Sequence, residues 1–171
     1  MEPELLERFA RGDLEAFEAL FRQFQGLVFS WIVRIVRDRG VAEDLTVEAF
    51  WRIHKAHARF DPRRGFEPWA RRIATNAALD HLRTAKPEAT LDPERVPAPP
   101  AVSREISPAV CSAFQQLPAK LQVVATLALI EELPYAEIAD ALGISVPAVK
   151  MREFRAVRLL REKLKKMGIE S

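Results

Sequence analysis

A series of cationic side chains near the end of the chain has the spacing of one helix face. Lys150, Arg152 and Arg155 alternate with apolar residues, and Arg158 and Arg161 continue the pattern. In such a helix the apolar residues pack inward and the cations face outward, where the first could reach bases and the later ones phosphates. The pattern indicates nucleic-acid binding; the alternative is a solvated helix face.

The residues before this series predict a helix-turn-helix. Ile138, Ala139 and Leu142 make an apolar face at helical spacing, and Ala139 is small enough for a second helix to cross close above it. Gly143 follows, where a helix end requires a residue that tolerates the left-handed conformation. Ser145 is a good N-cap for the next helix. The second helix of such a unit enters the DNA major groove, whereas an ordinary helical hairpin in an enzyme is the alternative.

Charge is distributed in opposed blocks along the 171 residues, although the net charge is only +2. Residues 52–86 hold nine Lys and Arg against three Asp and Glu, and residues 145–167 hold eight against two. Residues 1–51 and 87–144 are acidic, with net charges of −4 and −5. Two separate basic blocks predict two places that meet phosphate.

Catalysis and metal binding have weak support in the residues. His54 and His57 lie three positions apart and His81 lies further on, but no third or fourth ligand converges with them. There is one cysteine, Cys111, which allows no intramolecular disulfide and no Cys-based zinc site. No nucleophile–base pair and no phosphate-cradling Gly loop is evident. We therefore expect no enzyme activity, no catalytic residue, no metal and no cofactor.

The chain has neither a signal-peptide pattern nor a candidate membrane span. Its first residues are acidic, and its longest apolar stretches, near 27–36 and 121–130, are too short or too interrupted to cross a bilayer. These features predict a cytoplasmic protein without membrane insertion.

The spacing of apolar residues predicts an all-α fold of two small helical domains. In the first domain, residues 1–86, Gly12 turns the chain and Asp13 caps the next helix. The apolar stretch 26–37 favours a buried helix, with a strand as the alternative. The predicted elements of this domain are helices over 4–24, 26–37, 41–58 and 66–84 and a basic loop with two aromatic residues over 59–66.

Proline separates the two domains. Residues 87–107 hold Pro87, Pro93, Pro97, Pro99 and Pro100, which preclude a regular helix or strand and predict an extended, mobile linker. In the second domain, residues 108–171, helices are predicted over 109–116 and 118–130. The helix-turn-helix follows, and its last helix extends to about residue 166.

Four motifs, in order, resemble a known family. They are 11–21 (RGDLEAFEALF), 42–52 (AEDLTVEAFWR), 66–83 (FEPWARRIATNAALDHLR), and 117–124 (LPAKLQVV) with 133–139 (LPYAEIA). With the Pro-rich gap in its place, the chain resembles the extracytoplasmic-function sigma factors of bacterial RNA polymerase, the short sigma factors with only regions two and four. The resemblance implies a subunit that binds core polymerase, directs it to promoters and assists strand opening.

The family also implies which residues make the contacts. Region two would dock on the clamp helices of the β′ subunit through Asp44, Leu45, Glu48, Phe50 and Trp51. It would hold the −10 element and the separated strand through Phe60, Arg63, Arg64, Phe66, Trp69, Arg72, Asn76 and Arg83. Region four would meet the flap of the β subunit and read the −35 element through Ser145, Ala148, Lys150, Met151, Arg152 and Arg155. An anti-sigma factor is a further implied partner.

Two positions depart from the family pattern. Val47 stands where many relatives carry Gln, and Glu153 stands where an apolar residue normally packs inward. A buried unpaired carboxylate would be costly. We therefore expect Glu153 to turn outward, to pair with an Arg such as Arg158, or to be replaced in the core by Phe154.

Two other functions remain as hypotheses. A stand-alone helix-turn-helix regulator would bind duplex DNA without polymerase, and would need neither the basic aromatic loop nor the acidic helix. A sigma-like decoy would bind a regulator but direct no transcription, and Val47 and Glu153 favour it.

Overall fold

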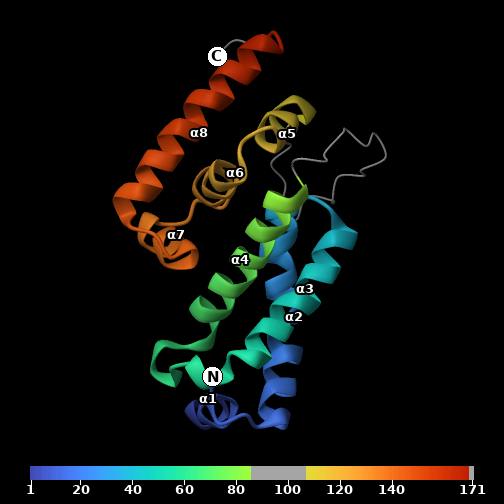
Figure 1. The fold of residues 1–171 in the computed structure, drawn as a ribbon, viewed down its shortest axis with the longest axis vertical. Coiled ribbons are helices and arrows are strands. Elements are labelled where there is room, and N and C mark those ends of the chain that lie inside the picture. Colours follow the sequence, from blue (N-terminus) through green and yellow to red (C-terminus); the bar gives the residue numbers. More distant parts are fainter. Residues whose placement is uncertain (86–106, 170–171) are drawn as a thin grey trace. The chain divides into compact units, whose positions relative to one another are not determined.

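The computed structural model describes residues 1–85 and 107–169, and it divides into two compact units. One unit is built from residues 1–81, and the other contains residues 107–169. All regular elements in the described ranges are helical, as the sequence predicts, and no β-strand is found there (Figure 1). The predicted linker lies outside the described residues, except for Ser107.

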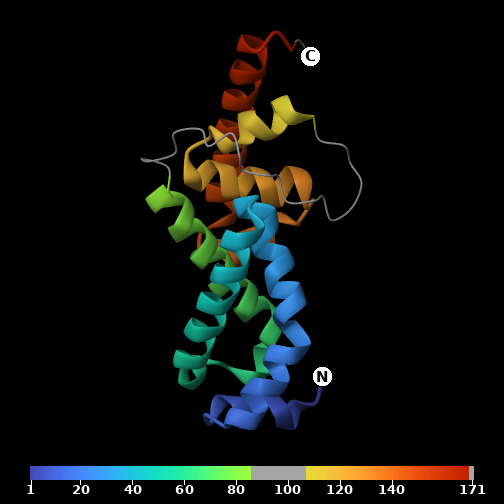
Figure 2. The ribbon, with the colours of Figure 1, turned by 90° about the vertical axis from the view of Figure 1, so that its right-hand side faces the viewer.

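The first unit is a helical bundle with a short irregular loop. Helices α2 and α3 pack side by side, and their connection comprises only Arg37 and Asp38 (Figure 2). The stretch 26–37 is helical rather than a strand, because all but its last residue belongs to the continuous helix α2. The elements are α1 (Pro3–Ala10), α2 (Leu14–Val36), α3 (Arg39–Lys55), the 3-10 turns η1 (His57–Arg59) and η2 (Pro62–Arg64), and α4 (Phe66–Ala85).

Side-chain caps set the helix starts in this unit. The Asp13 carboxylate accepts hydrogen bonds from the backbone N–H groups of Glu15 (2.9 Å) and Ala16 (3.2 Å), and so caps α2 as predicted. Arg8 Nε donates to the same carboxylate at 2.8 Å, which ties α1 to the cap. Asp38 caps α3 in the same way by accepting from Val41 N–H at 3.0 Å. These caps fix the residues at which α2 and α3 begin.

The core of the first unit is rich in aromatic rings. Phe9 lies at its centre, with ring centroids 5.5 Å from Phe60, 5.8 Å from Phe66 and 6.0 Å from Trp69. Phe66 also packs against Phe24 at 4.8 Å. Rings of this size bury a large apolar area and stack edge to face, so this cluster ties the loop before α4 to α1 and α2.

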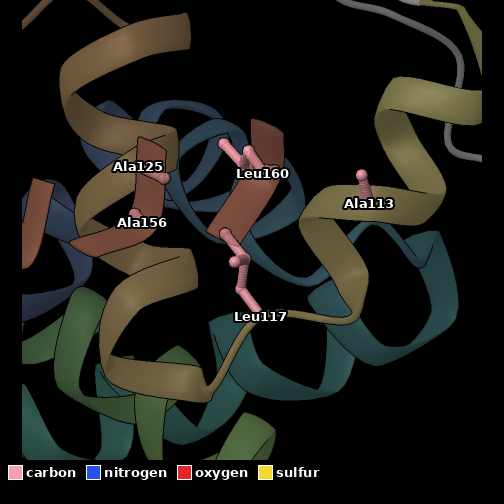
Figure 3. Packing of buried hydrophobic residues seen from close by; sticks show 5 residues of the cluster. All are labelled: Ala113, Leu117, Ala125, Ala156 and Leu160. Carbon is pink, nitrogen blue, oxygen red and sulfur yellow. The ribbon is translucent and has the colours of Figure 1, made fainter. Parts of the chain in front are cut away.

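The second unit is built around small and branched aliphatic side chains. Its buried cluster joins α5, α6 and α8, and Ala125 and Ala156 let α6 and α8 approach closely (Figure 3). Its residues are Ala113, Leu117, Ala125, Ala156 and Leu160. The elements are α5 (Pro108–Gln115), α6 (Ala119–Ala125), the π-helical turn η4 (Thr126–Ile130), α7 (Tyr135–Leu142) and α8 (Val146–Lys166).

The predicted helix over 118–130 is not one regular α-helix. It is α-helical to Ala125 and then widens to a π-helical turn. Among the described residues, the Gln122 side-chain oxygen is buried without a hydrogen-bond partner in this helix. A π-turn shifts the following side chains around the axis, and this change is not visible in apolar spacing alone.

Candidate nucleic-acid interface

An exposed face of α3 combines apolar and acidic side chains. Val47 and Trp51 lie one turn apart, with exposed fractions of 68% and 53%, and Asp44 and Glu48 are exposed beside them. The Lys55 ammonium lies 4.8 Å from the centroid of the Trp51 ring. We call this the α3 face; an apolar centre framed by carboxylates suits a partner surface that carries cations around an apolar pocket.

Two α3 residues that were predicted to contact polymerase are buried or half-buried rather than exposed. Phe50 is 3% exposed and packs against the rings of Phe21 at 4.8 Å and Phe17 at 6.4 Å, so it belongs to the core and not to the α3 face. Leu45 is half-buried. Phe50 lies on the side of α3 that packs against α2, whereas its neighbour Trp51, about 100° further around the helix, lies on the exposed side.

The α3 face is also tied to α4. Arg52 Nε donates to Glu48 at 3.0 Å, and Arg52 Nη1 donates to Asp80 of α4 at 3.0 Å. Glu48 therefore has an intramolecular partner, and Arg52 holds the acidic edge of the face in place.

The basic loop before α4 presents its cations and buries its aromatic rings. Arg63 and Arg64 side chains are 89% and 87% exposed and share the Asp61 carboxylate at 3.2 Å and 3.9 Å. The hydrogen bond from Arg63 holds the pKa of Asp61 below its ordinary value. Phe60 and Phe66 are 5% and 1% exposed, which corrects the expectation that they contact DNA.

The burial of these two rings has a local cause. Two 3-10 turns and Gly65, at φ 80°, make the loop so tight that Phe60 and Phe66 both turn toward Phe9. Gly is suited to this backbone conformation because it has no Cβ to clash. The rings thus fix the shape of the loop from which the arginines project.

One face of α4 carries four predicted residues. Trp69, Arg72, Asn76 and Arg83 are separated by three, four and seven positions, which places them within about 60° around a helix of 3.6 residues per turn. Arg72 and Arg83 are exposed, and Asn76 is half-buried. Trp69 is half-buried, with its ring 4.9 Å from that of Phe60. We call this the α4 face; an aromatic ring, an amide and two guanidinium groups together can stack, hydrogen-bond and neutralise a single strand.

The helix-turn-helix is formed by α7 and α8. Gly143 ends α7 in the left-handed conformation at φ 66°, and Ser145 Oγ accepts the Ala148 N–H at 3.2 Å at the start of α8. Of the predicted apolar face, Ile138 and Ala139 are buried and Leu142 is half-buried, and Val149 of α8 is buried as well. On α8, Lys150, Met151 and Arg155 are exposed, as is Ser145 before it, whereas Ala148 and Arg152 are half-buried.

Each of the two units matches a known protein family. Residues 20–88 match the Sigma-70 region 2 family, and residues 110–160 match the Sigma-70 region 4 family. The chain is 30% identical to the ECF RNA polymerase sigma factor SigW of Bacillus subtilis, over 94% of this chain and 95% of SigW. It is 33% identical to the RNA polymerase sigma factor CarQ of Myxococcus xanthus, over 96% and 98%. The chain belongs to the ECF sigma factors of the sigma-70 family.

A solved structure supports the same conclusion. CnrH, in its complex with the cytosolic domain of CnrY, is 26% identical to this chain and superposes with a TM-score of 0.62, over 96% of this chain and 97% of the other. The two units therefore correspond to sigma regions two and four, which serve promoter recognition and transcription initiation.

Glu153 of this sigma factor does not lie unpaired in the core. Its side chain is half-buried and meets Tyr135 at the start of α7, and the hydrogen bond from Tyr135 together with the carboxylate charge raises the pKa of the Tyr135 hydroxyl. Arg158 pairs with Glu162 at 3.7 Å, so the expected pairing of Glu153 with Arg158 is wrong. Phe154 is 65% exposed, so the expectation that it replaces Glu153 in the core is also wrong. Because Glu153 is only half-buried, the expectation that it turns outward is met in part.

Three exposed residues were missed by the sequence reasoning. Val47 was treated as a departure from the pattern, although its spacing of four from Trp51 already predicts that the two share a face. The other two exposed residues are Phe154 and Tyr135. Their surroundings depend on the contact between Glu153 and Tyr135, which spacing does not predict.

His54 and His57 are part of the packing of the first unit. His54 lies 4.8 Å from the Phe17 ring, and His57 Nδ1 lies 3.2 Å from the Ala10 carbonyl oxygen. Within residues 1–85 and 107–169, no group of three or more His, Cys, Asp or Glu side chains is placed to hold a metal ion, and no helix is long and apolar enough to span a bilayer.

Proposed function

We propose that this ECF sigma factor uses residues 1–86 to bind core RNA polymerase and the −10 element, and residues 108–171 to bind the −35 element. The observation that carries the polymerase assignment is the α3 face. Exposed Val47 and Trp51, framed by Asp44 and Glu48, form a surface that a stand-alone DNA-binding regulator does not need. Carboxylates would repel DNA, so this face suits a protein partner with cations.

The partner surface for the α3 face is the clamp of the β′ subunit. In this arrangement Trp51 fills the centre of the contact, Asp44 and Glu48 meet basic partner residues, and Phe50 and Leu45 support the helix from behind. Because exposed carboxylates at the rim act mainly on association, raised salt should slow the binding of core polymerase.

Promoter opening is assigned to the α4 face and the arginines of the preceding loop. Arg63, Arg64, Arg72 and Arg83 would hold phosphates, and Asn76 would hydrogen-bond an unstacked base. Trp69 is half-buried against Phe60, and the exposed part of its ring would stack on a base. Phe60 and Phe66 have an indirect role, which is to shape the loop.

Run-off transcription with purified core polymerase and the promoter of the chain's own gene tests this proposal. A transcript with a fixed start supports it, and core binding without a transcript supports the decoy hypothesis. Duplex binding without core binding would support the stand-alone regulator. Asn76→Ala should reduce open-complex formation, measured by permanganate reactivity of unpaired thymines, more than it reduces core binding; a parallel loss of both would show that Asn76 is structural.

An anti-sigma factor is the proposed regulator. CnrH, one of the similar proteins, was solved with the cytosolic domain of CnrY. In this chain the α3 face combines exposed apolar area with charge, and a regulator that covers it would block polymerase. Affinity purification from the native host should recover such a partner, whereas recovery of polymerase subunits alone would count against it.

A further inference from the structure

The outer surface of the helix-turn-helix exposes large apolar side chains between cations. Met151 and Phe154 are 53% and 65% exposed on α8, and Tyr135 is 39% exposed at the start of α7. A surface hollow of about 700 Å³ is lined by Tyr135, Lys150, Glu153, Phe154, Val157 and Arg158, among others. Apolar groups within a cationic surface suit a ligand that carries both phosphates and apolar groups. Duplex DNA is such a ligand, because each thymine presents a methyl group in the major groove.

The contact between α7 and α8 decides which side chain is presented. Neighbouring residues lie about 100° apart around a helix, so a rotation that buried Phe154 would bring the Glu153 carboxylate outward. Glu153 is half-buried beside Tyr135, and Lys150 Nζ lies 5.7 Å from the centroid of the Tyr135 ring. The three side chains tie the first turns of α8 to α7 in the rotation that exposes Phe154.

We propose that Phe154, with Met151, determines specificity in the −35 element by contacting the C5-methyl groups of thymine, and that Tyr135 and Glu153 are the positioning residues that present Phe154. This inference rests on the proposed function, because it requires that α8 lies in the major groove. Thymine is the base that carries a methyl group in that groove, and apolar side chains including Phe recognise it. Lys150, Arg155 and Arg158 surround the apolar pair and can reach phosphates.

Replacing thymine by deoxyuridine tests the contact, since it removes only the methyl group. The reconstituted polymerase holoenzyme first selects −35 sequences from a promoter library randomised there. Each thymine of the selected element is then replaced by deoxyuridine in a synthetic duplex. We expect at least one position to lose about fourfold in affinity, the factor for ~0.8 kcal/mol of one buried methyl-sized group.

The variant Phe154→Ala should abolish this thymine-to-uracil ratio. Because Phe154 is mostly exposed, the variant should fold, and its melting temperature serves as the control. A selected element without thymine, or a ratio of one at every position in the wild type, would overturn the inference while leaving the proposed function intact. Selection of no upstream element at all would instead contradict the proposed function. An unchanged ratio with weaker polymerase binding in Phe154→Ala would assign the hollow to a protein contact and overturn the inference.

The positioning residues have their own readout. Tyr135→Phe keeps the ring beneath Lys150 but removes the hydroxyl, and it should lower the thymine-to-uracil ratio. Glu153→Gln keeps a side-chain oxygen that accepts the hydrogen bond, so it should retain more of the ratio than Glu153→Ala. A purely stabilising role of the pair would change the melting temperature and leave the ratio unaltered, which would exclude the positioning role.

Discussion

Aromatic rings fill the core of region two but not the core of region four. In region two, Phe9, Phe60 and Phe66 form the core, and the arginines of the loop project from it. In region four the buried side chains are aliphatic, Phe114 is partly buried against them, and Tyr135 and Phe154 are exposed. An aromatic residue in a basic segment therefore predicts neither a core position nor a DNA contact by itself, because the neighbouring core decides whether its ring is buried.

The largest expected effect tests the aromatic core of region two. Phe66→Ala should destabilise the chain by about 3–5 kcal/mol, the usual cost of removing a buried ring. Phe154→Ala should change stability by less than about 0.5 kcal/mol, because the ring is mostly exposed. Urea unfolding followed by circular dichroism measures both. Equal destabilisation by the two variants would contradict the conclusion that aromatic rings form the core of region two but not that of region four.

Trp51→Ala separates binding from folding within region two. As an exposed aromatic at the centre of the α3 face, Trp51 should contribute about 2 kcal/mol or more to core polymerase affinity, or roughly thirtyfold. Its melting temperature should stay near that of the wild type. Leu27→Ala, on the exposed side of α2, is the matched control and should bind normally. Normal polymerase binding by Trp51→Ala would remove the α3 face from the interface.

Lys150→Ala examines the cations of region four. If Lys150 contacts a base, promoter affinity should fall by about 1–3 kcal/mol, mainly for the preferred −35 sequence. If it contacts a phosphate, all sequences should be weakened alike, and the slope of affinity against salt should decrease by about one. Fluorescence anisotropy of the holoenzyme on −35 duplexes at several salt concentrations distinguishes these results. Unchanged affinity and slope would mean that this part of α8 does not face DNA.

Helix boundaries were predictable because they depend on local chemistry. Asp13, Ser145 and Gly143 act within a few positions of themselves, so capping and the left-handed conformation could be inferred from sequence. The apolar spacing gave the helices of both units for the same reason, and the family motifs gave the two sigma regions.

Side-chain exposure was less predictable because it depends on distant residues. Phe60 and Phe66 lie in a tight loop without periodicity, and their burial requires Phe9, which is about fifty positions away. The pairing of Glu153 with Tyr135 spans two helices and a turn, and no local rule selects it over Arg158. Spacing alone likewise could not show that Phe50 faces α2 while Trp51, its neighbour, faces outward.

The smallest expected effect concerns the Asp13 cap, which is local to region two. The hydrogen bond from Arg8 holds the pKa of Asp13 below its ordinary value, and the capped backbone N–H groups act in the same direction. A carboxylate with a lowered folded-state pKa stabilises the fold above its unfolded-state pKa, and this stabilisation is lost as pH falls through the folded-state value.

Asp13→Asn tests this contribution, because asparagine caps a helix about as well as aspartate but carries no charge for Arg8. The melting temperature of the variant should lie slightly below that of the wild type at neutral pH. The difference should remain constant down to about pH 4, near the unperturbed pKa of Asp, and should vanish at lower pH as the wild-type carboxyl is protonated. A difference that persisted at low pH would mean that Asp13 acts through cap geometry rather than through its charge.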